Sequence, residues 1–412
     1  MVHVDGEYLA RSLAELVRIN SINPAFSGGA TNEAEIARWL AAELERLGLA
    51  VALHEPEPGR ASVVGTLKGA AGGRSILLYG HIDTVGVEGM ADPFAGRVRD
   101  GRLYGRGAYD MKCGVAACLA AVKALAEADA RPAGDVLVAF VADEEVASVG
   151  MAEVLRHHRA DAAIVTEPTE LELVVAHKGF CWIEVETVGR AAHGSRFDLG
   201  IDANLRMGRF LAELDRLEAE LRRSPPHALL GPPSLHAALL QGGTGESTYA
   251  ARCRLVIERR TLPGETPEHA LGQVTAILDR LAAQDPTFQA TARVLLARDP
   301  WETAVDAPAA RIVARAAEAV LGHPPTVAGR AYWMDTALIA AAGADVVVLG
   351  PTGAGAHADE EWVELESVRQ VAEILARAAA AYTAERESGG VDEWGKRQQS
   401  PTPPLPHSPP LP

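Results

Sequence analysis

Short apolar runs alternate with helical stretches through the first part of the chain, and this alternation constrains the fold most strongly. The runs at Ser62–Leu67, Ser75–Tyr79, Asp135–Val141 and Asp161–Val165 have the length of buried strands. Helical stretches such as Met111–Ala126 lie between them. Strands of this kind that alternate with helices are typical of an α/β fold whose sheet is covered on both faces. We therefore predict an α/β domain with a mostly parallel central sheet.

Two local patterns predict further elements. Residues Asn32–Leu47 carry an apolar side chain at every fourth position, which indicates an amphipathic helix. The pair Asp100-Gly101 lies between two short stretches of strand-forming residues and predicts a tight hairpin turn.

The pattern changes near Gly179, where strands and helices follow the order β-α-β-β-α-β. This order is typical of an α+β ferredoxin-like module, which we predict as an inserted domain. The α/β pattern then resumes, and the end of the chain is rich in Pro and Ser, a composition that favours disorder. The predicted boundaries are 1–178 and 299–386 for the α/β domain, 179–298 for the insertion, and 387–412 for a disordered tail.

Composition excludes several classes of partner. The chain carries 39 Lys and Arg against 55 Asp and Glu, a net charge of -16, whereas nucleic acids and anionic membranes favour basic proteins. No apolar stretch reaches the roughly 18 residues of a membrane span, and the first residues lack the pattern of a secretory signal. The four cysteines form no CxxC pair, which favours reduced thiols. We expect a soluble, cytoplasmic protein with neither nucleic acid nor membrane as partner.

His, Asp and Glu recur where the predicted strands end. They are His81 and Asp83 in "GHIDTV", Asp110 in "GRGAYDMKCG", Asp143, Glu144 and Glu145 in "VADEEVAS", Glu167 in "TEPT", and His357 in "GPTGAGAHADE". Ligands of open α/β sheets bind outside the carboxyl ends of the strands, so these side chains are expected to lie close together.

Each residue also has a simpler interpretation. A lone histidine after a strand is more often structural, and the adjacent acids Glu144 and Glu145 could begin a helix, where carboxylates are favoured. Asp110 could cap the helix that follows it, and Glu167 could lie in an ordinary turn. All of these would have to hold at five strand ends together, which favours one shared site.

Imidazole and carboxylate without thiolate form a ligand set that suits Zn²⁺, Co²⁺ or Mn²⁺ in a catalytic site. Two histidines and three carboxylates are more than one catalytic zinc needs. They indicate two divalent metal ions that share a bridging carboxylate and a hydroxide. Since neighbouring side chains point in different directions, one of two adjacent acids can bind metal while the other accepts a proton.

The motifs "YGHIDTV", "GRGAYDMKCG", "DEE", "EPT" and "GAHADEEWV" resemble the dinuclear zinc amidohydrolase and exopeptidase family. That family includes acetylornithine deacetylase, succinyl-diaminopimelate desuccinylase, aminoacylase and carboxypeptidase G. The motifs occur in the family's order and extend to about Glu387. The resemblance implies a zinc-exopeptidase-like catalytic domain and an inserted domain that serves dimerisation or acts as a lid.

The resemblance implies which residues bind the metal ions. Asp110 would be the bridging ligand, and a cis peptide would join it to the next residue. His81 and Glu167 would complete one metal site, and Glu145 and His357 the other.

Further roles follow from the same resemblance. Asp83 would orient His81, and Glu144 would be the general base that activates the bridging water and protonates the leaving nitrogen. His193 in "GRAAHGS" would reach the partner subunit's site and stabilise the oxyanion. Arg260 would bind the substrate's carboxylate, although Arg259 is adjacent and strand alternation leaves the choice between them open.

The chain departs from the family pattern at a few positions. Cys113 stands where Gly is usual, which changes packing more than chemistry, and Thr352 replaces a frequent Gly near His357. Ala250 and Ala251 stand where related sequences often carry Pro and an acid. These changes bear on substrate contacts, and Asp335 in "AYWMDTA" is expected to shape the pocket floor.

We therefore expect a homodimeric, metal-dependent hydrolase of the amide bond in a small N-acyl amino acid. The stretch "STY…RC…ERRTLPGE" most resembles the acetylornithine deacetylase and desuccinylase branch. A dipeptidase or a glutamate-releasing carboxypeptidase is the nearest alternative. A non-catalytic binding protein on the same fold is a further alternative, but such a protein is expected to lack ligands or the base, and none is missing here.

Overall fold

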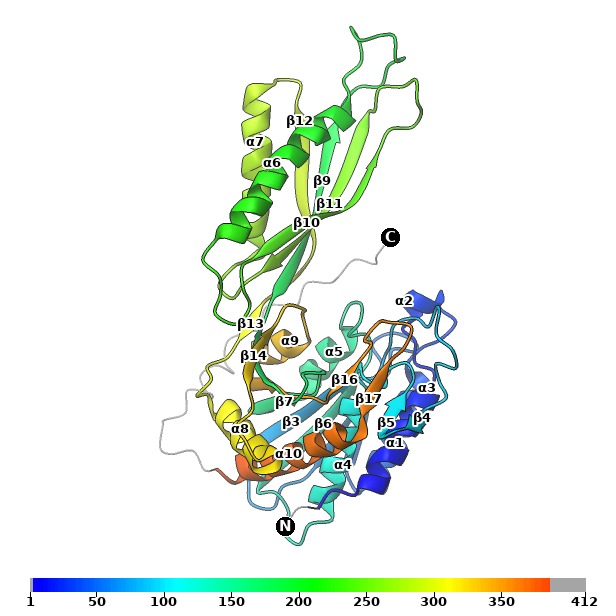
Figure 1. Ribbon diagram of the computed structural model, residues 1–412, viewed down its shortest axis with the longest axis vertical. Coiled ribbons are helices and arrows are strands. Elements are labelled where there is room, and N and C mark those ends of the chain that lie inside the picture. The colour runs from blue at the N-terminus through cyan, green and yellow to red at the C-terminus, as the bar shows by residue number, and fades with distance from the viewer. Residues whose placement is uncertain (1–2, 386–412) are drawn as a thin grey trace. The chain divides into compact units, whose positions relative to one another are not determined.

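The computed structural model describes residues 3–385 of the chain, and the predicted tail at 387–412 lies outside the described residues. The chain divides into two compact units (Figure 1). The larger comprises residues 1–175, 303–328 and 334–412, and the smaller comprises 176–302 and 329–333. The larger unit is therefore assembled from segments that are far apart in the sequence.

A mixed sheet forms the centre of the larger unit, with strands in the order β1-β2-β6-β3-β7-β15-β8. The strands are β1 (Ala50–His54), β2 (Ser62–Leu67), β3 (Gly73–His81), β6 (Gly134–Val141), β7 (Ala162–Val165), β8 (Leu173–His177) and β15 (Asp345–Val348). The neighbours β6-β3-β7-β15 are parallel, whereas β1, β2 and β8 pair antiparallel at the flanks. The predicted α/β class is confirmed, and its parallel strands form the centre of a sheet that is mixed as a whole.

Helices cover both faces of this sheet. Successive side chains of a strand point to opposite faces, so the apolar strands present a surface for helices on each side. At Gly80 an added Cβ would lie 2.8 Å from Val115 of α4, so this face of β3 packs closely on α4. The preceding residue, Tyr79, faces the other side and donates its hydroxyl to Asp335 at the start of α9. The helices are α1 (Gly6–Arg18), α2 (Pro24–Ser27), α3 (Ala34–Arg46), α4 (Lys112–Ala126), α5 (Val149–His157), α8 (Pro308–Leu321), α9 (Thr336–Ala341) and α10 (Leu365–Ala384).

A small antiparallel sheet in the larger unit has the order β16-β17-β5-β4. Its strands are β4 (Arg97–Arg99), β5 (Arg102–Tyr104), β16 (Gly353–Ala354) and β17 (Trp362–Glu364). The predicted turn at Asp100-Gly101 joins β4 to β5. Because Tyr104 pairs with Trp362, the loop after β5 and the loop before β17 meet at the same end of the sheet.

The smaller unit follows the predicted β-α-β-β-α-β order. Its elements are β9 (Gly179–Val188), α6 (Ala203–Arg223), β10 (Ser234–Gly242), β11 (Arg252–Thr261), α7 (Pro267–Gln284) and β12 (Gln289–Arg298). The antiparallel sheet has the order β10-β11-β9-β12, and both helices pack on it around a buried apolar core. A short strand, β13 (Trp301–Glu302), pairs antiparallel with Ala176 and His177 inside the smaller unit, and β14 (Val327–Arg330) is a further short strand. Within residues 3–385, no helix is both long enough and apolar enough to cross a membrane.

Candidate metal centre

The five side chains expected to bind metal converge in the larger unit. His81 ends β3, Glu145 follows β6 and Glu167 follows β7, all at the carboxyl ends of parallel strands. Asp110 and His357 come from the two loops that meet at the end of the small sheet. The sheet edge and these loops therefore place nitrogen and oxygen donors from distant parts of the sequence together.

Asp110 lies between the two histidines. Its Oδ1 is 3.2 Å from Nε2 of His81, and its Oδ2 is 3.3 Å from Nε2 of His357. Each oxygen thus faces a different imidazole, which is the arrangement that a bridging carboxylate requires. The peptide bond from Asp110 to Met111 is cis, as expected.

The other two carboxylates each lie beside one histidine. Glu167 Oε1 is 3.7 Å from Nε2 of His81, and Glu145 Oε2 is 3.1 Å from Nε2 of His357. The donors therefore form two groups joined by Asp110.

Asp83 holds several parts of the site together. It is fully buried, and its Oδ1 lies 3.5 Å from Nδ1 of His81, on the ring nitrogen that does not face Asp110. Its carboxylate also accepts the backbone N–H groups of Glu144 and Glu145, at 3.1 and 3.2 Å, and a hydrogen bond from Asn23 at 2.9 Å. One carboxylate thus positions a histidine and the turn that carries both acids.

Negative charge is crowded in this buried site. Burial raises the pKa of Glu167 to about 8. Burial, and then the carboxylate of Glu167, raise the pKa of Glu144 well above its ordinary value. Burial, and then Asp110, raise the pKa of Glu145. The protein alone therefore leaves these carboxylates short of positive charge.

The surrounding carboxylates favour the charged form of the histidines. Hydrogen bonds to Asp110 and Glu145 raise the pKa of His357 to about 10. For His81, burial acts to lower the pKa, but Glu167 and other carboxylates outweigh it and raise the pKa well above its usual range. Burial likewise opposes ionisation of Asp110, yet the hydrogen bonds from both histidines hold its pKa below the ordinary value.

The residues fit divalent cations. Oε1 of Glu167 is buried and has no hydrogen-bond partner among residues 3–385, an arrangement that is costly for a carboxylate unless a cation neutralises it. The ligand atoms of His81, Asp110 and Glu145 lie within 4.8 Å of one another, as do those of His81, Glu144 and Glu167. Nitrogen and carboxylate donors without thiolate match the ligand preferences of catalytic zinc and related ions.

Glu361 supports the bridging residue, and we did not single it out from the sequence. Its Oε1 accepts the backbone N–H groups of Tyr109 and Asp110, at 2.8 and 2.9 Å. Its Oε2 accepts the N–H of Gly107 at 3.0 Å and pairs with Arg106 at 2.7 Å. In the sequence it resembles its exposed neighbour Glu360, so no local signal identifies it.

Two other acids from the motifs have supporting positions. Asp143 forms an ion pair with Arg60 and accepts a hydrogen bond from Asn23, so it shapes the turn before Glu144. Asp335 is fully buried and accepts the hydroxyl of Tyr79 at 2.6 Å, and burial raises its pKa to about 6.

The remaining predicted site residues, His193 and Arg260, lie in the smaller unit. His193 is exposed, and its Nδ1 lies 2.9 Å from the hydroxyl of Ser195. Arg259 is buried and paired with Glu265, whereas the side chain of Arg260 is 32% exposed. The two arginines therefore lie on different faces of β11, and Arg260 is the one that solvent reaches.

Residues 77–381 match the family described as Peptidase family M20/M25/M40. An acetylornithine deacetylase from Myxococcus xanthus is 34% identical over 330 residues, which cover 78% of this chain and 84% of that protein. The N-formyl-4-amino-5-aminomethyl-2-methylpyrimidine deformylase of Bacillus subtilis (strain 168) is 32% identical over 275 residues, 62% of this chain and 64% of that protein.

Solved structures share the fold. A tripeptidase from Staphylococcus aureus superposes with a TM-score of 0.76 at 20% identity, covering 93% of this chain and 100% of that one. The YXEP protein of Bacillus subtilis, a dinuclear metal-binding peptidase, superposes with a TM-score of 0.73 at 16% identity, covering 92% of this chain and 98% of that one. The chain is an amide-bond hydrolase. It belongs to peptidase family M20/M25/M40.

Proposed function

We propose that this hydrolase removes the acyl group from a small N-acyl amino acid, in the manner of acetylornithine deacetylase or succinyl-diaminopimelate desuccinylase. It would use two divalent metal ions, with zinc as the expected ion and cobalt or manganese as substitutes. The observation that carries the proposal is the carboxylate of Asp110, which faces both His81 and His357. The similarity to the Myxococcus deacetylase supports the choice of substrate.

The metal ions would be held by the five converging side chains: His81, Glu167, Asp110, Glu145 and His357. When bound, the ions would polarise the substrate's carbonyl and lower the pKa of the attacking water. Glu144 would take the proton from that water and pass it to the leaving nitrogen. Its position supports this role, because its ligand atom lies within 4.8 Å of those of His81 and Glu167.

Two residues of the smaller unit would act on the substrate. We assign Arg260 to the substrate's carboxylate because its guanidinium has a planar fork of donors and its side chain is 32% exposed, whereas Arg259 is buried against Glu265. Arg260 itself pairs with Glu258 at 2.6 Å, so a substrate carboxylate would share or replace that partner. His193 would stabilise the negative charge that develops on the carbonyl oxygen. Its exposure in a loop supports a role toward a group from outside its own unit.

We propose a cytoplasmic homodimer that associates through the smaller unit. Strand β10 lies at the edge of its sheet, and Leu239 and Leu240 on it are 58% and 54% exposed. An exposed apolar edge strand is a ready surface for pairing with a second chain. Sedimentation of the wild type and of Leu240→Lys tests this: the proposal expects a dimer that the substitution weakens, and a monomeric wild type would contradict it.

Activity toward a panel of amides tests the substrate. The purified protein is offered N-acetyl-ornithine, N-succinyl-diaminopimelate, N-formyl amines and dipeptides, before and after chelation and after return of Zn²⁺ or Co²⁺. We expect turnover of an N-acyl amino acid that is lost on chelation and restored by metal. Turnover of dipeptides alone would favour the dipeptidase or carboxypeptidase alternative. Unchanged activity after complete metal removal would contradict the proposal.

A further inference from the structure

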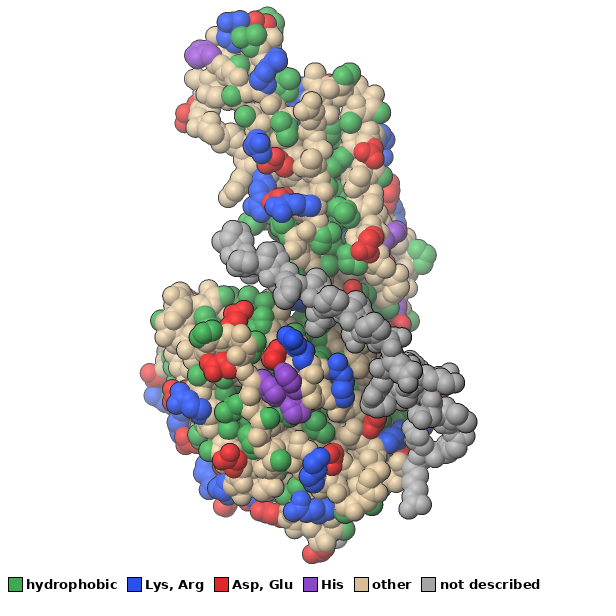
Figure 2. All heavy atoms as spheres, turned by 180° about the vertical axis from the view of Figure 1, so that it is seen from behind, with side chains coloured by type: hydrophobic (Ala, Val, Ile, Leu, Met, Phe, Trp, Pro, Cys, Tyr) green, Lys and Arg blue, Asp and Glu red, His purple; other side chains and the backbone are tan. Residues whose placement is uncertain are grey.

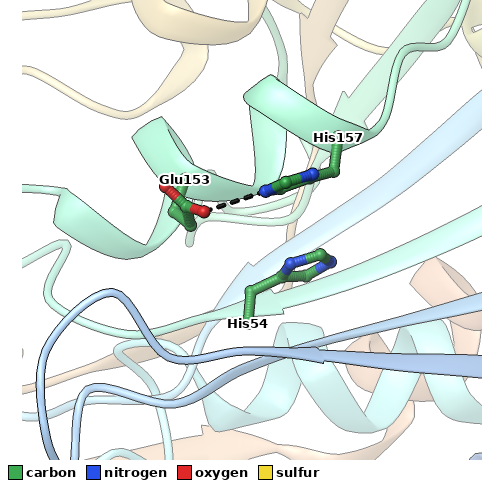
Figure 3. A group of neighbouring side chains, drawn as sticks. All are labelled: His54, Glu153 and His157. Atoms are coloured by element: carbon green, nitrogen blue, oxygen red, sulfur yellow. Dashed lines mark hydrogen bonds and ion pairs between the residues drawn. The ribbon is translucent and has the colours of Figure 1, made fainter.

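A group of histidines lies at the surface of the larger unit, and none of its members belongs to the candidate metal centre. His54 ends the edge strand β1, while Glu153 and His157 lie one turn apart on α5, and His158 follows that helix. Figure 2 shows histidine side chains gathered on the surface of this unit. Figure 3 shows Glu153 and His157 projecting from α5 beside the ring of His54.

The donor atoms of this group are close together. Nε2 of His157 is 2.9 Å from Oε1 of Glu153, and Nε2 of His54 is 2.8 Å from Nε2 of His158. The rings of His54 and His157 are stacked, with centroids 4.8 Å apart. The ligand atoms of His54, Glu153 and His157 all lie within 4.8 Å of one another. His54, Glu153 and His157 thus place their donors in one small region, and His158 adjoins it through its contact with His54.

We propose that His54, Glu153, His157 and His158 bind a divalent transition-metal ion, with zinc as the best match. Imidazole nitrogen and carboxylate oxygen are common zinc ligands. His54, Glu153 and His157 would supply three donors of a tetrahedral site, and the adjoining His158 would supply the fourth. Zinc bonds of about 2.0–2.1 Å place tetrahedral donors roughly 3.3 Å apart. The pairs His54–His158 and Glu153–His157, at 2.8 and 2.9 Å, lie near this separation, and side-chain rotation would be needed to bring both pairs onto one ion.

The surroundings also favour a cation at this place. His157 is the last residue of α5, and the carboxyl end of a helix carries partial negative charge. Burial, together with neighbouring histidines, lowers the pKa of His54 and of His158, which favours the neutral rings that can bind a metal ion. The 2.8 Å contact between their Nε2 atoms would give way to bonds with the ion. The cluster therefore presents ligands in the form that a metal ion requires.

A metal ion here would connect the edge of the central sheet to the end of α5. That helix begins directly after the turn that carries Glu144 and Glu145. The expected role is structural, because the ion would hold β1 and α5 together and stabilise the folded protein by binding it in preference to the unfolded chain.

Zinc stoichiometry tests the proposal. Wild type whose candidate metal centre has been saturated with zinc is dialysed against Zn²⁺, and bound metal is measured by mass spectrometry. His54→Ala and His157→Ala remove ligands, while His323→Ala removes an exposed histidine of the same unit and is the control. We expect one more zinc per chain in wild type and His323→Ala than in the other two variants, and a zinc-dependent rise in Tm that follows the same pattern.

Glu153→Gln provides a second test that keeps the shape of the side chain. It should lower the affinity for the additional zinc ion by about tenfold or more while the protein remains folded. Equal zinc content in wild type, His54→Ala, His157→Ala and Glu153→Gln would overturn the proposal. So would an equal loss in His323→Ala, because the extra metal would then be bound without regard to this cluster.

Discussion

Oδ1 of Asp83 lies 3.5 Å from Nδ1 of His81, while Nε2 of the same ring faces Asp110 and Glu167. The aspartate therefore contacts the histidine on the side that a metal ion would not occupy. A carboxylate in this position fixes the ring's orientation and makes the other nitrogen a better ligand.

Loss of this contact is expected to weaken metal binding. Asp83→Ala should lower metal affinity by roughly 10–100-fold, because His81 and the turn of Glu144 and Glu145 lose the carboxylate that they share. The 3.1 Å contact of His81 Nδ1 with the backbone carbonyl of residue 83 is retained. Titration of the metal-free protein with Zn²⁺ measures this, and Asp92→Ala, an exposed change in the same unit, is the control. Equal affinity in both variants would show that Asp83 does not orient the ligand.

Glu361 is expected to be a major source of local stability. Glu361→Ala leaves buried Arg106 unpaired and three backbone N–H groups without their acceptor, which should cost about 3–5 kcal/mol in the free energy of unfolding. Urea denaturation compares it with Glu360→Ala, which changes the exposed neighbour. If both variants unfold at the same urea concentration, Glu361 does not support the loop of Asp110.

His193 provides a test of the role assigned to the smaller unit. His193→Ala should reduce kcat by about 10²–10³-fold, as expected when one donor to a developing oxyanion is removed, while metal content stays at the wild-type level. His269→Ala, another exposed histidine of the smaller unit, should have near-normal rates. Near-normal turnover by His193→Ala would exclude His193 from catalysis.

The pH dependence of stability should report on His177. Burial lowers the pKa of this histidine to about 4, so the folded protein keeps it neutral where the unfolded chain, with a pKa near 6.5, takes up a proton. The stability that neutral His177 contributes to the folded protein is therefore fully present above about pH 6.5. As pH falls toward 4, the free energy of unfolding decreases by up to about 1.4 kcal/mol per pH unit because of this group.

Denaturation of wild type and His177→Gln across this range isolates the effect, because the other titrating groups are common to both. The difference in unfolding free energy should change between pH 6.5 and 4 and be constant above it. His269→Gln serves as the exposed control. A difference that does not vary with pH would mean that His177 is protonated equally in both states.

Local chemistry made part of the fold predictable. The bounds of β2 and the turn at Asp100-Gly101 agree with the prediction because strand length and turn residues are properties of a few neighbouring positions. Strand direction was not predictable in the same way. An apolar run such as Ser62–Leu67 shows burial on both faces, yet β2 pairs antiparallel with β6.

The convergence of the candidate ligands followed from their positions at strand ends, since parallel strands bring their carboxyl ends to one edge. Supporting residues were harder to identify. Asn23 and Glu361 contact the site across long stretches of sequence. Asn23 lies outside the quoted motifs, and Glu361 lies within "GAHADEEWV" beside Glu360, where the letters alone do not show which acid is buried. The choice between Arg259 and Arg260 needed the packing of β11, because alternation alone does not show which face is buried.

The proposed mechanism depends on different roles for two adjacent acids, Glu144 as general base and Glu145 as metal ligand. Turnover of N-acetyl-ornithine, or of the best substrate found, and bound metal should be measured together on wild type, Glu144→Ala and Glu145→Ala. We expect Glu144→Ala to lose turnover while its metal content stays near wild type, and Glu145→Ala to lose both metal and turnover. Loss of metal in Glu144→Ala, or full turnover without metal in Glu145→Ala, would contradict the assignment of one acid as base and the other as ligand.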